Sequence, residues 1–112
     1  MKKILLIIAT TISFSMNAQM SDGSYNTTAT ATFSIAMGYG TTASGYNSTA
    51  MGSETIAGGS YSIAMGRDTT ANGFGSTAMG LTTYASGYMS TAMGQRTIAS
   101  DYASLVVGKH NL

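Results

Sequence analysis

The chain has 112 residues, enough for at most one small domain, and only 8% of them are charged. It has no Cys, which excludes a disulfide framework and a thiolate metal site, and its one His, His110, leaves almost no catalytic base. With a formal net charge of +1 it lacks the basic surface of a nucleic-acid-binding protein, so we expect a structural or binding module without enzymatic activity, cofactor or metal.

The first nineteen residues have the pattern of a secretory signal peptide. Lys2 and Lys3 precede a short apolar run at 4–9, and small and polar residues follow it as far as Ala18. The run is shorter than the roughly 20 apolar residues of a transmembrane helix. We therefore expect residues 1–19 to be removed on export, leaving a mature chain at the cell surface or outside the cell; the alternative is a buried N-terminal helix or strand.

From Ala29 onward the chain repeats. Ala recurs eleven times at a spacing of seven, ending at Ala99. The residue two before the Ala alternates strictly between Ser and Thr from Ser34 to Thr97, and Ser104 continues the alternation before Val106. The true period is therefore fourteen residues in two similar halves. A coiled coil also has a period of seven, but a Gly in nearly every heptad would cost a helix about 1 kcal/mol each. Most residues just before the Ala are β-branched, which favours strands.

We interpret each half as a strand of four or five residues that ends at Gly, where the chain turns. Side chains alternate along a strand, so Ala and Ser or Thr share one face, and the β-branched residue and the residue after Ala share the other. A fourteen-residue coil is thin, so only the small side chains fit inside it, where the hydroxyls would hydrogen-bond to the backbone or to each other.

The predicted fold is an all-β parallel β-solenoid, or β-roll, whose fourteen-residue coils stack at about 4.8 Å. Residues 20–33 form a degenerate first coil, and residues 34–103 form five full coils. Residues 104–112 form a partial last coil and a tail.

The two outward faces of this solenoid differ. One carries Met after the Ala in five coils, whereas the other carries Ser, Gly or Asn. Nothing within a single coil can cover the Met side chains, and fully burying one contributes about 1.5–3 kcal/mol. We therefore expect several chains to assemble around a common axis through this face, and the physical argument leaves their number open. The predicted interface residues are Ile35, Met37, Thr49, Met51, Ile63, Met65, Thr77, Met79, Thr91, Met93 and Val107.

The repeating unit resembles the head repeat of the trimeric autotransporter adhesins, the YadA-like head. The best match is the run Asn-Ser-Thr-Ala-Met-Gly at 47–52, followed by Thr55, Ala57 and Gly59, and the resemblance covers about 34–108. It implies a left-handed parallel β-roll that forms a homotrimer with its hydrophobic face inward, in a surface adhesin. The chain departs from the family pattern in having Met for the usual Ile, Thr for many of the Val, and the leading Asn only once.

The resemblance implies attachment to a host, to the extracellular matrix or to another surface, through a matrix protein or a glycan. The family's coiled-coil stalk and membrane-anchor barrel have no counterpart after Gly108, so we expect no membrane anchor of its own, and either a free secreted head or a fragment of a longer fibre protein. One alternative is a purely structural spacer, because stacked repeats propagate a stiff rod. Another is an ice-binding solenoid, which needs an outward Thr array, whereas the Thr column beginning at Thr41 is predicted to face inward.

One turn position is mostly aromatic. Tyr46, Phe74, Tyr88 and Tyr102 share it, and Ser60 interrupts the series. This rim would face a ligand, either a glycan or a protein; the alternative is packing between coils that stiffens the stack.

The other turn position is partly charged. Glu54, Asp68 and Arg96 share it. Two carboxylates are few ligands for Ca²⁺, so we expect a solvated rim and no metal there.

Overall fold

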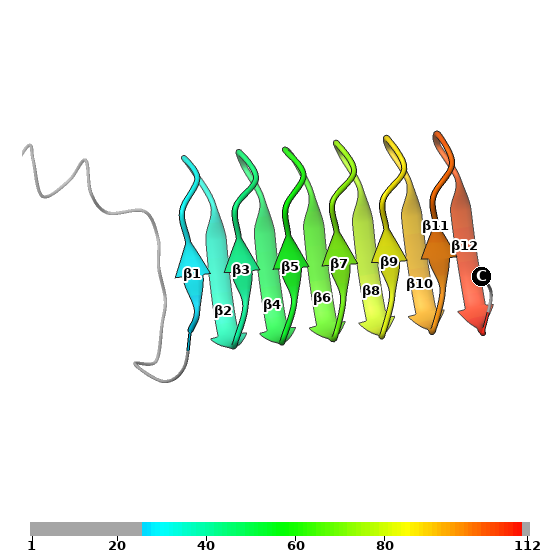
Figure 1. The fold of residues 1–112 in the computed structure, drawn as a ribbon, viewed down its shortest axis with the longest axis horizontal. Coiled ribbons are helices and arrows are strands. Elements are labelled where there is room, and N and C mark those ends of the chain that lie inside the picture. Colours follow the sequence, from blue (N-terminus) through cyan, green and yellow to red (C-terminus); the bar gives the residue numbers. More distant parts are fainter. Residues whose placement is uncertain (1–25, 111–112) are drawn as a thin grey trace, which may run out of the picture.

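The structure, a computed structural model, describes residues 26–110, and the predicted signal peptide lies outside this range. Figure 1 shows a stack of similar coils in which each coil contributes one strand to each of two facing sheets. Both sheets have six strands, and all their pairings are parallel. The predicted all-β solenoid with coils of about fourteen residues is therefore confirmed. Residues 26–110 include no helix of the length and apolarity needed to cross a membrane.

One sheet, here called the long-strand sheet, consists of five-residue strands. These are β2 (Ile35–Tyr39), β4 (Thr49–Ser53), β6 (Ile63–Arg67), β8 (Thr77–Leu81), β10 (Thr91–Gln95) and β12 (Leu105–Lys109). Every residue pairs with the residue fourteen positions later, as Met51 does with Met65. The fourteen-residue period of the sequence therefore sets the pairing register of this sheet.

The other sheet, here called the short-strand sheet, consists of two-residue strands. These are β1 (Thr28–Ala29), β3 (Thr42–Ala43), β5 (Ile56–Ala57), β7 (Thr70–Ala71), β9 (Tyr84–Ala85) and β11 (Ile98–Ala99). They pair with the same fourteen-residue offset, as Tyr84 does with Ile98.

These strand lengths differ from the prediction of four or five residues ending at Gly in both halves. In the long-strand sheet each strand continues one residue beyond the Gly, because Gly52, at φ 124°, adopts a conformation that other residues avoid and stays in the ladder. In the short-strand sheet the strand stops after two residues. There the amides of Ser44 and Gly45 both donate to the carbonyl oxygen of Ala57, at 3.0 and 3.2 Å, and the chain turns.

The core is built from alanine. In β4, Ala50 is buried between the half-buried Thr49 and Met51, and the other long strands up to β10 repeat the buried Ala between two more exposed neighbours. The predicted inward face is therefore confirmed. The fully buried alanines are Ala36, Ala43, Ala50, Ala57, Ala64, Ala71, Ala78, Ala85, Ala92 and Ala99.

The inward hydroxyl columns are also buried, but most of them are not hydrogen-bonded. Ser34 donates from Oγ to the carbonyl oxygen of Ala31 at 2.6 Å. Neighbours in one column are a coil apart, about 4.8 Å, which exceeds hydrogen-bond distance, and the strand carbonyls are used by the ladders. The prediction that the inward hydroxyls form internal hydrogen bonds is therefore wrong for Thr41, Ser48, Thr55, Ser62, Thr69, Ser76, Thr83, Ser90, Thr97 and Ser104.

Candidate functional site

All eleven predicted interface residues lie on the outward side of the long-strand sheet, here called the methionine face. The Met side chains follow one another in register from Met37 to Met93, and Val107 continues the column on β12. All five Met are half-buried in the single chain. Leu105 also belongs to this face and is 68% exposed, although the sequence prediction omitted it.

The methionine face has the chemistry of an association surface. Its two outward columns, which flank the buried Ala, carry only Met, Ile, Thr, Leu and Val, and the charged Arg67 and Lys109 lie beyond the Gly at the ends of β6 and β12. Covering these two columns therefore desolvates no charged side chain within them. Unbranched thioether chains adapt to the shape of a facing surface. The face extends without interruption over six strands.

The outward side of the short-strand sheet is more polar. Ser44, Asn72, Ser86 and Ser100 follow the buried Ala in their coils and are exposed. The column before the Ala mixes Thr with Ile and Tyr. The Thr column beginning at Thr41 is fully buried, so it offers no outward array for binding ice.

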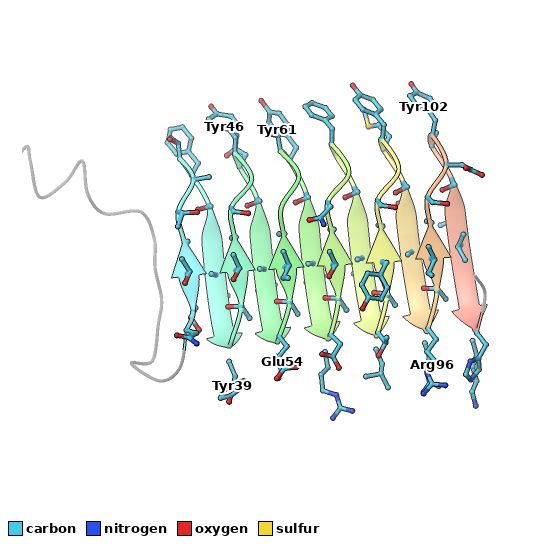
Figure 2. All side chains as sticks on the ribbon, viewed as in Figure 1. Tyr39, Tyr46, Glu54, Tyr61, Arg96 and Tyr102 are labelled. Atoms are coloured by element: carbon cyan, nitrogen blue, oxygen red, sulfur yellow. The ribbon has the colours of Figure 1, made fainter. Side chains whose placement is uncertain are left out.

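One edge of the solenoid carries an unbroken series of rings, here called the aromatic ladder. Figure 2 shows the ring of each coil beside that of the next along this edge. The ring centroids of successive members are 5.0–5.9 Å apart. The members are Phe33, Tyr46, Tyr61, Phe74, Tyr88 and Tyr102.

The geometry of the aromatic ladder directs its rings toward each other. Phe74 and Tyr88 are stacked at 5.0 Å, and Tyr88 and Tyr102 are stacked at 5.4 Å. The hydroxyls of Tyr46, Tyr61 and Tyr102 point away from the solenoid (Figure 2). The other three pairs, from Phe33 to Phe74, are edge-to-face with interplanar angles of 66–78°, so both faces and edges of the rings contact neighbouring rings. This arrangement favours packing between coils over stacking of a ligand on ring faces.

Sequence reasoning missed two members of the aromatic ladder, Phe33 and Tyr61. They occupy the turn position after the predicted one, at φ 58° and 59°, in the two coils whose predicted position holds Thr32 or Ser60. Tyr61 thereby closes the gap at Ser60, with centroids 5.6 Å from Tyr46 and 5.4 Å from the next ring. The available signal was that one of these two consecutive residues is aromatic in every coil.

The opposite edge carries the charged turn position. Glu54 and Asp68 lie in successive coils there. The pKa of Glu54 is raised by its side-chain hydrogen bond with Asp68, by the charge of Asp68 and by partial desolvation. The charge of Arg67 lowers the same pKa. Within residues 26–110 no three His, Cys, Asp or Glu side chains lie together in a group that could hold a metal ion. Arg96 lies farther along the same edge (Figure 2).

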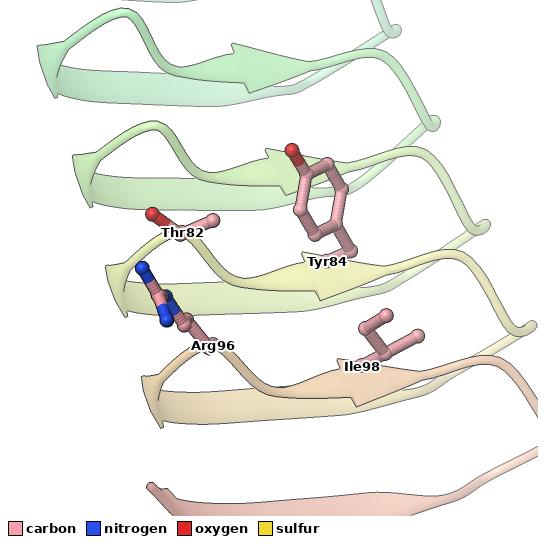
Figure 3. Close-up of a pocket in the computed structure, with 4 residues that line it drawn as sticks. All are labelled: Thr82, Tyr84, Arg96 and Ile98. Carbon is pink, nitrogen blue, oxygen red and sulfur yellow. The ribbon is translucent and has the colours of Figure 1, made fainter. Parts of the chain in front are cut away.

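A shallow depression of about 210 Å³ lies beside this edge, on the outward side of the short-strand sheet. Figure 3 shows its four lining side chains, with Thr82 and Arg96 on the turns and Tyr84 and Ile98 on the strands that follow. The sequence prediction treated Arg96 as part of a solvated rim and did not connect it with the other three.

The comparison with known families gives one result. The family model of the YadA head domain repeat (2 copies) matches six overlapping segments, at 25–41, 29–55, 43–69, 57–83, 71–97 and 85–110. No curated protein and no solved structure matches the chain. Domains of the matching family are non-enzymatic adhesin heads that generally form homotrimers and are exposed at the cell surface.

Proposed function

The chain belongs to the YadA head domain repeat family, and on that basis we propose that it is exported and acts as the homotrimeric head of a surface adhesin. Residues 1–19 direct export and are removed, residues 20–33 form a degenerate first coil, residues 34–103 form five head repeats, and residues 104–112 form a partial last coil and a tail. The head attaches the cell to a matrix protein, a glycan or another surface.

The observation that carries this proposal is the exposure of the methionine face in the single chain. The fully buried apolar residues are alanines, which contribute little burial energy each, about 0.8 kcal/mol per CH₂-sized group. The larger apolar side chains, such as Met51, Met65 and Met79, are only half-buried. Three chains with their methionine faces toward a common axis bury them.

This arrangement assigns a role to each surface. The methionine face is the trimer interface, and the side that carries Asn72 and Tyr84 faces outward. The rim formed by Tyr46, Phe74, Tyr88 and Tyr102 remains at an edge where a ligand can reach its hydroxyls.

The mass of the assembly in solution tests the interface. Met65→Lys places a charge in the middle of the methionine face and is expected to dissociate the trimer, because a buried unpaired charge is strongly unfavourable. Asn72→Lys adds the same charge at an exposed position on the opposite side of the same coil and is expected to leave the trimer intact. Light scattering that gives the trimer mass for Met65→Lys would show that the methionine face is not the interface.

Attachment is tested separately with the purified trimer on arrays of matrix proteins and glycans. One observation favours a structural spacer instead, namely that rings such as Phe74 and Tyr88 stack on each other. Saturable binding to an array component supports the adhesin. A trimer that binds no component supports the spacer.

A further inference from the structure

We propose that the depression lined by Thr82, Tyr84, Arg96 and Ile98 binds a uronic acid residue of an acidic polysaccharide. In this site the guanidinium of Arg96 pairs with the sugar carboxylate, and the ring of Tyr84 packs against the apolar face of the pyranose. The inference rests on the proposed function in one respect, because the trimer turns this side of the solenoid outward.

The backbone around the depression is held in place by the ladder. Tyr84 and Ile98 are register partners on β9 and β11, and both side chains point outward, 42% and 38% exposed. The turns before them are also joined, since the amide of Arg96 donates to the carbonyl oxygen of Leu81 at 2.9 Å. The four side chains therefore project from a preorganised frame, which reduces the ordering cost of binding.

Tyr84 differs from the rings of the aromatic ladder. It takes part in no ring pair among the described residues, whereas each ladder ring lies 5.0–5.9 Å from the next. Its neighbours in the strand column are Thr70 and Ile98, and its ring stands out beside the depression in Figure 3. An aromatic face without a ring partner is a surface on which the C–H groups of a sugar can pack.

The charge around Arg96 is suited to a carboxylate. The adjoining turns carry Leu81–Thr82 on one side and Lys109–His110 on the other, so neither supplies a competing carboxylate. Arg96 is exposed and lies beside Thr82 in Figure 3. A guanidinium pairs with a planar carboxylate through two parallel hydrogen bonds, and a nearby hydroxyl can donate a third.

The repeat supplies its own comparison, because the same four positions recur in every coil. In the preceding coils the turn position of Arg96 is occupied by Glu54 and Asp68. The strand position of Tyr84 and Ile98 is occupied there by Ile56 and Thr70. The pairing of a cation with an aromatic residue is thus found at one level of the described solenoid.

The residue type at Thr82 is unusual for its backbone conformation. Thr82 has φ 56° and is the one β-branched residue among the non-glycine residues of positive φ in residues 26–110. The turn has positive φ at the same position in the neighbouring coils, at Asp68 and Arg96, so the turn sets this conformation, and Thr82 differs in being a β-branched residue that rarely adopts it.

The test is binding of the trimer of the mature chain to hyaluronan oligosaccharides, which carry a carboxylate on every second sugar. Arg96→Gln and Tyr84→Thr are each expected to weaken binding about tenfold or more, since each removes one of the two main contacts. Arg67→Gln removes the other exposed Arg of this edge, beside Asp68, and is expected to leave the affinity unchanged. Circular dichroism verifies that all three variants remain folded.

The probes separate recognition of the sugar from attraction to charge. Hyaluronan with its carboxyl groups reduced to alcohols is expected to lose binding. Equal binding of poly-glutamate, with no effect of Tyr84→Thr, would overturn the site by showing charge attraction alone. So would the absence of hyaluronan binding by a preparation whose mass is that of a trimer. A monomeric mass for the wild-type chain would instead overturn the proposed assembly.

Discussion

Gly66 and Gly80 are register partners on β6 and β8, and a Cβ added to Gly66 would lie 2.0 Å from the carbonyl oxygen of Gly80. Gly66 also has φ 122°, a conformation that L side chains rarely adopt. Gly66→Val therefore has to break the ladder locally. We expect it to lower the free energy of unfolding by about 3 kcal/mol or more, measured by thermal melting and circular dichroism.

Gly40 is the matched control. It also has positive φ, 61°, but an added Cβ would meet only Glu54, whose nearest atom, Cγ, is at the ordinary contact distance of 3.6 Å. The next coils hold Glu54 and Asp68 at the same turn position. Gly40→Ala is expected to cost only about 1 kcal/mol. Equal losses for the two variants would contradict the role assigned to the Gly66 column.

The buried hydroxyl columns lead to a prediction of the opposite sign. Thr69 is fully buried, and its Oγ1 has no hydrogen-bond partner. Val has the same shape without the hydroxyl, so Thr69→Val is expected to be neutral or to stabilise the chain by about 1 kcal/mol. Thr69→Ala, which also removes the methyl group, is expected to destabilise by about 1 kcal/mol. A loss of stability in Thr69→Val, measured by denaturant titration, would indicate that the hydroxyl is hydrogen-bonded.

The aromatic ladder is expected to stabilise the stack most at its middle. Tyr61 contacts two rings, with centroids at 5.6 and 5.4 Å, whereas Tyr102 contacts one and is 75% exposed. With about 0.5–1.5 kcal/mol for each ring pair, Tyr61→Ala should cost about 1–3 kcal/mol and Tyr102→Ala about half of that. Tyr61→Phe keeps the ring and is expected to melt like the wild type. Equal melting temperatures for both Ala variants would argue that the ring contacts add no stability.

The carboxylate pair predicts a dependence of stability on pH. The pKa of Glu54 is raised above its ordinary value of 4.5, chiefly by its side-chain hydrogen bond with Asp68 and then by the charge of Asp68. The folded chain therefore holds this proton more tightly than the unfolded chain does. The resulting stabilisation is complete below pH 4.5 and is lost as the pH rises through the raised value.

Glu54→Gln removes this dependence. We expect the variant to melt at a higher temperature than the wild type at neutral pH, and the difference to shrink as the pH falls through the raised pKa of Glu54 and to be smallest below pH 4.5. Asp68→Asn removes the partner and should reproduce the effect. A difference in melting temperature that is constant across this pH range would exclude the pair as its cause.

The sequence predicted those features of the fold that repetition determines. The fourteen-residue register and the inward Ala and hydroxyl columns follow from period and side-chain size, and Met51 lies over Met65 as the spacing required. Strand length was not predictable in this way, because it depends on the backbone conformation at Gly52 and on the shared carbonyl acceptor of Ala57.

Side-chain contacts that combine different columns of the repeat could not be predicted from the sequence either. Tyr61 completes the aromatic ladder from a different sequence position than Tyr46, and only the turn geometry places the two rings together. The depression beside Arg96 likewise combines side chains of two coils and two different columns. The interface role of the methionine face and the ligand role of the rim remain predictions.

Identical columns have a consequence for how such a head can change its length. Because Met51 lies over Met65 and Met65 over Met79, deleting or duplicating fourteen residues within the five repeats joins like to like in the Ala, Gly and Met columns. Unequal recombination within the gene can therefore lengthen or shorten the reach of the head in steps of about 4.8 Å while the Ala, Gly and Met columns keep their contacts.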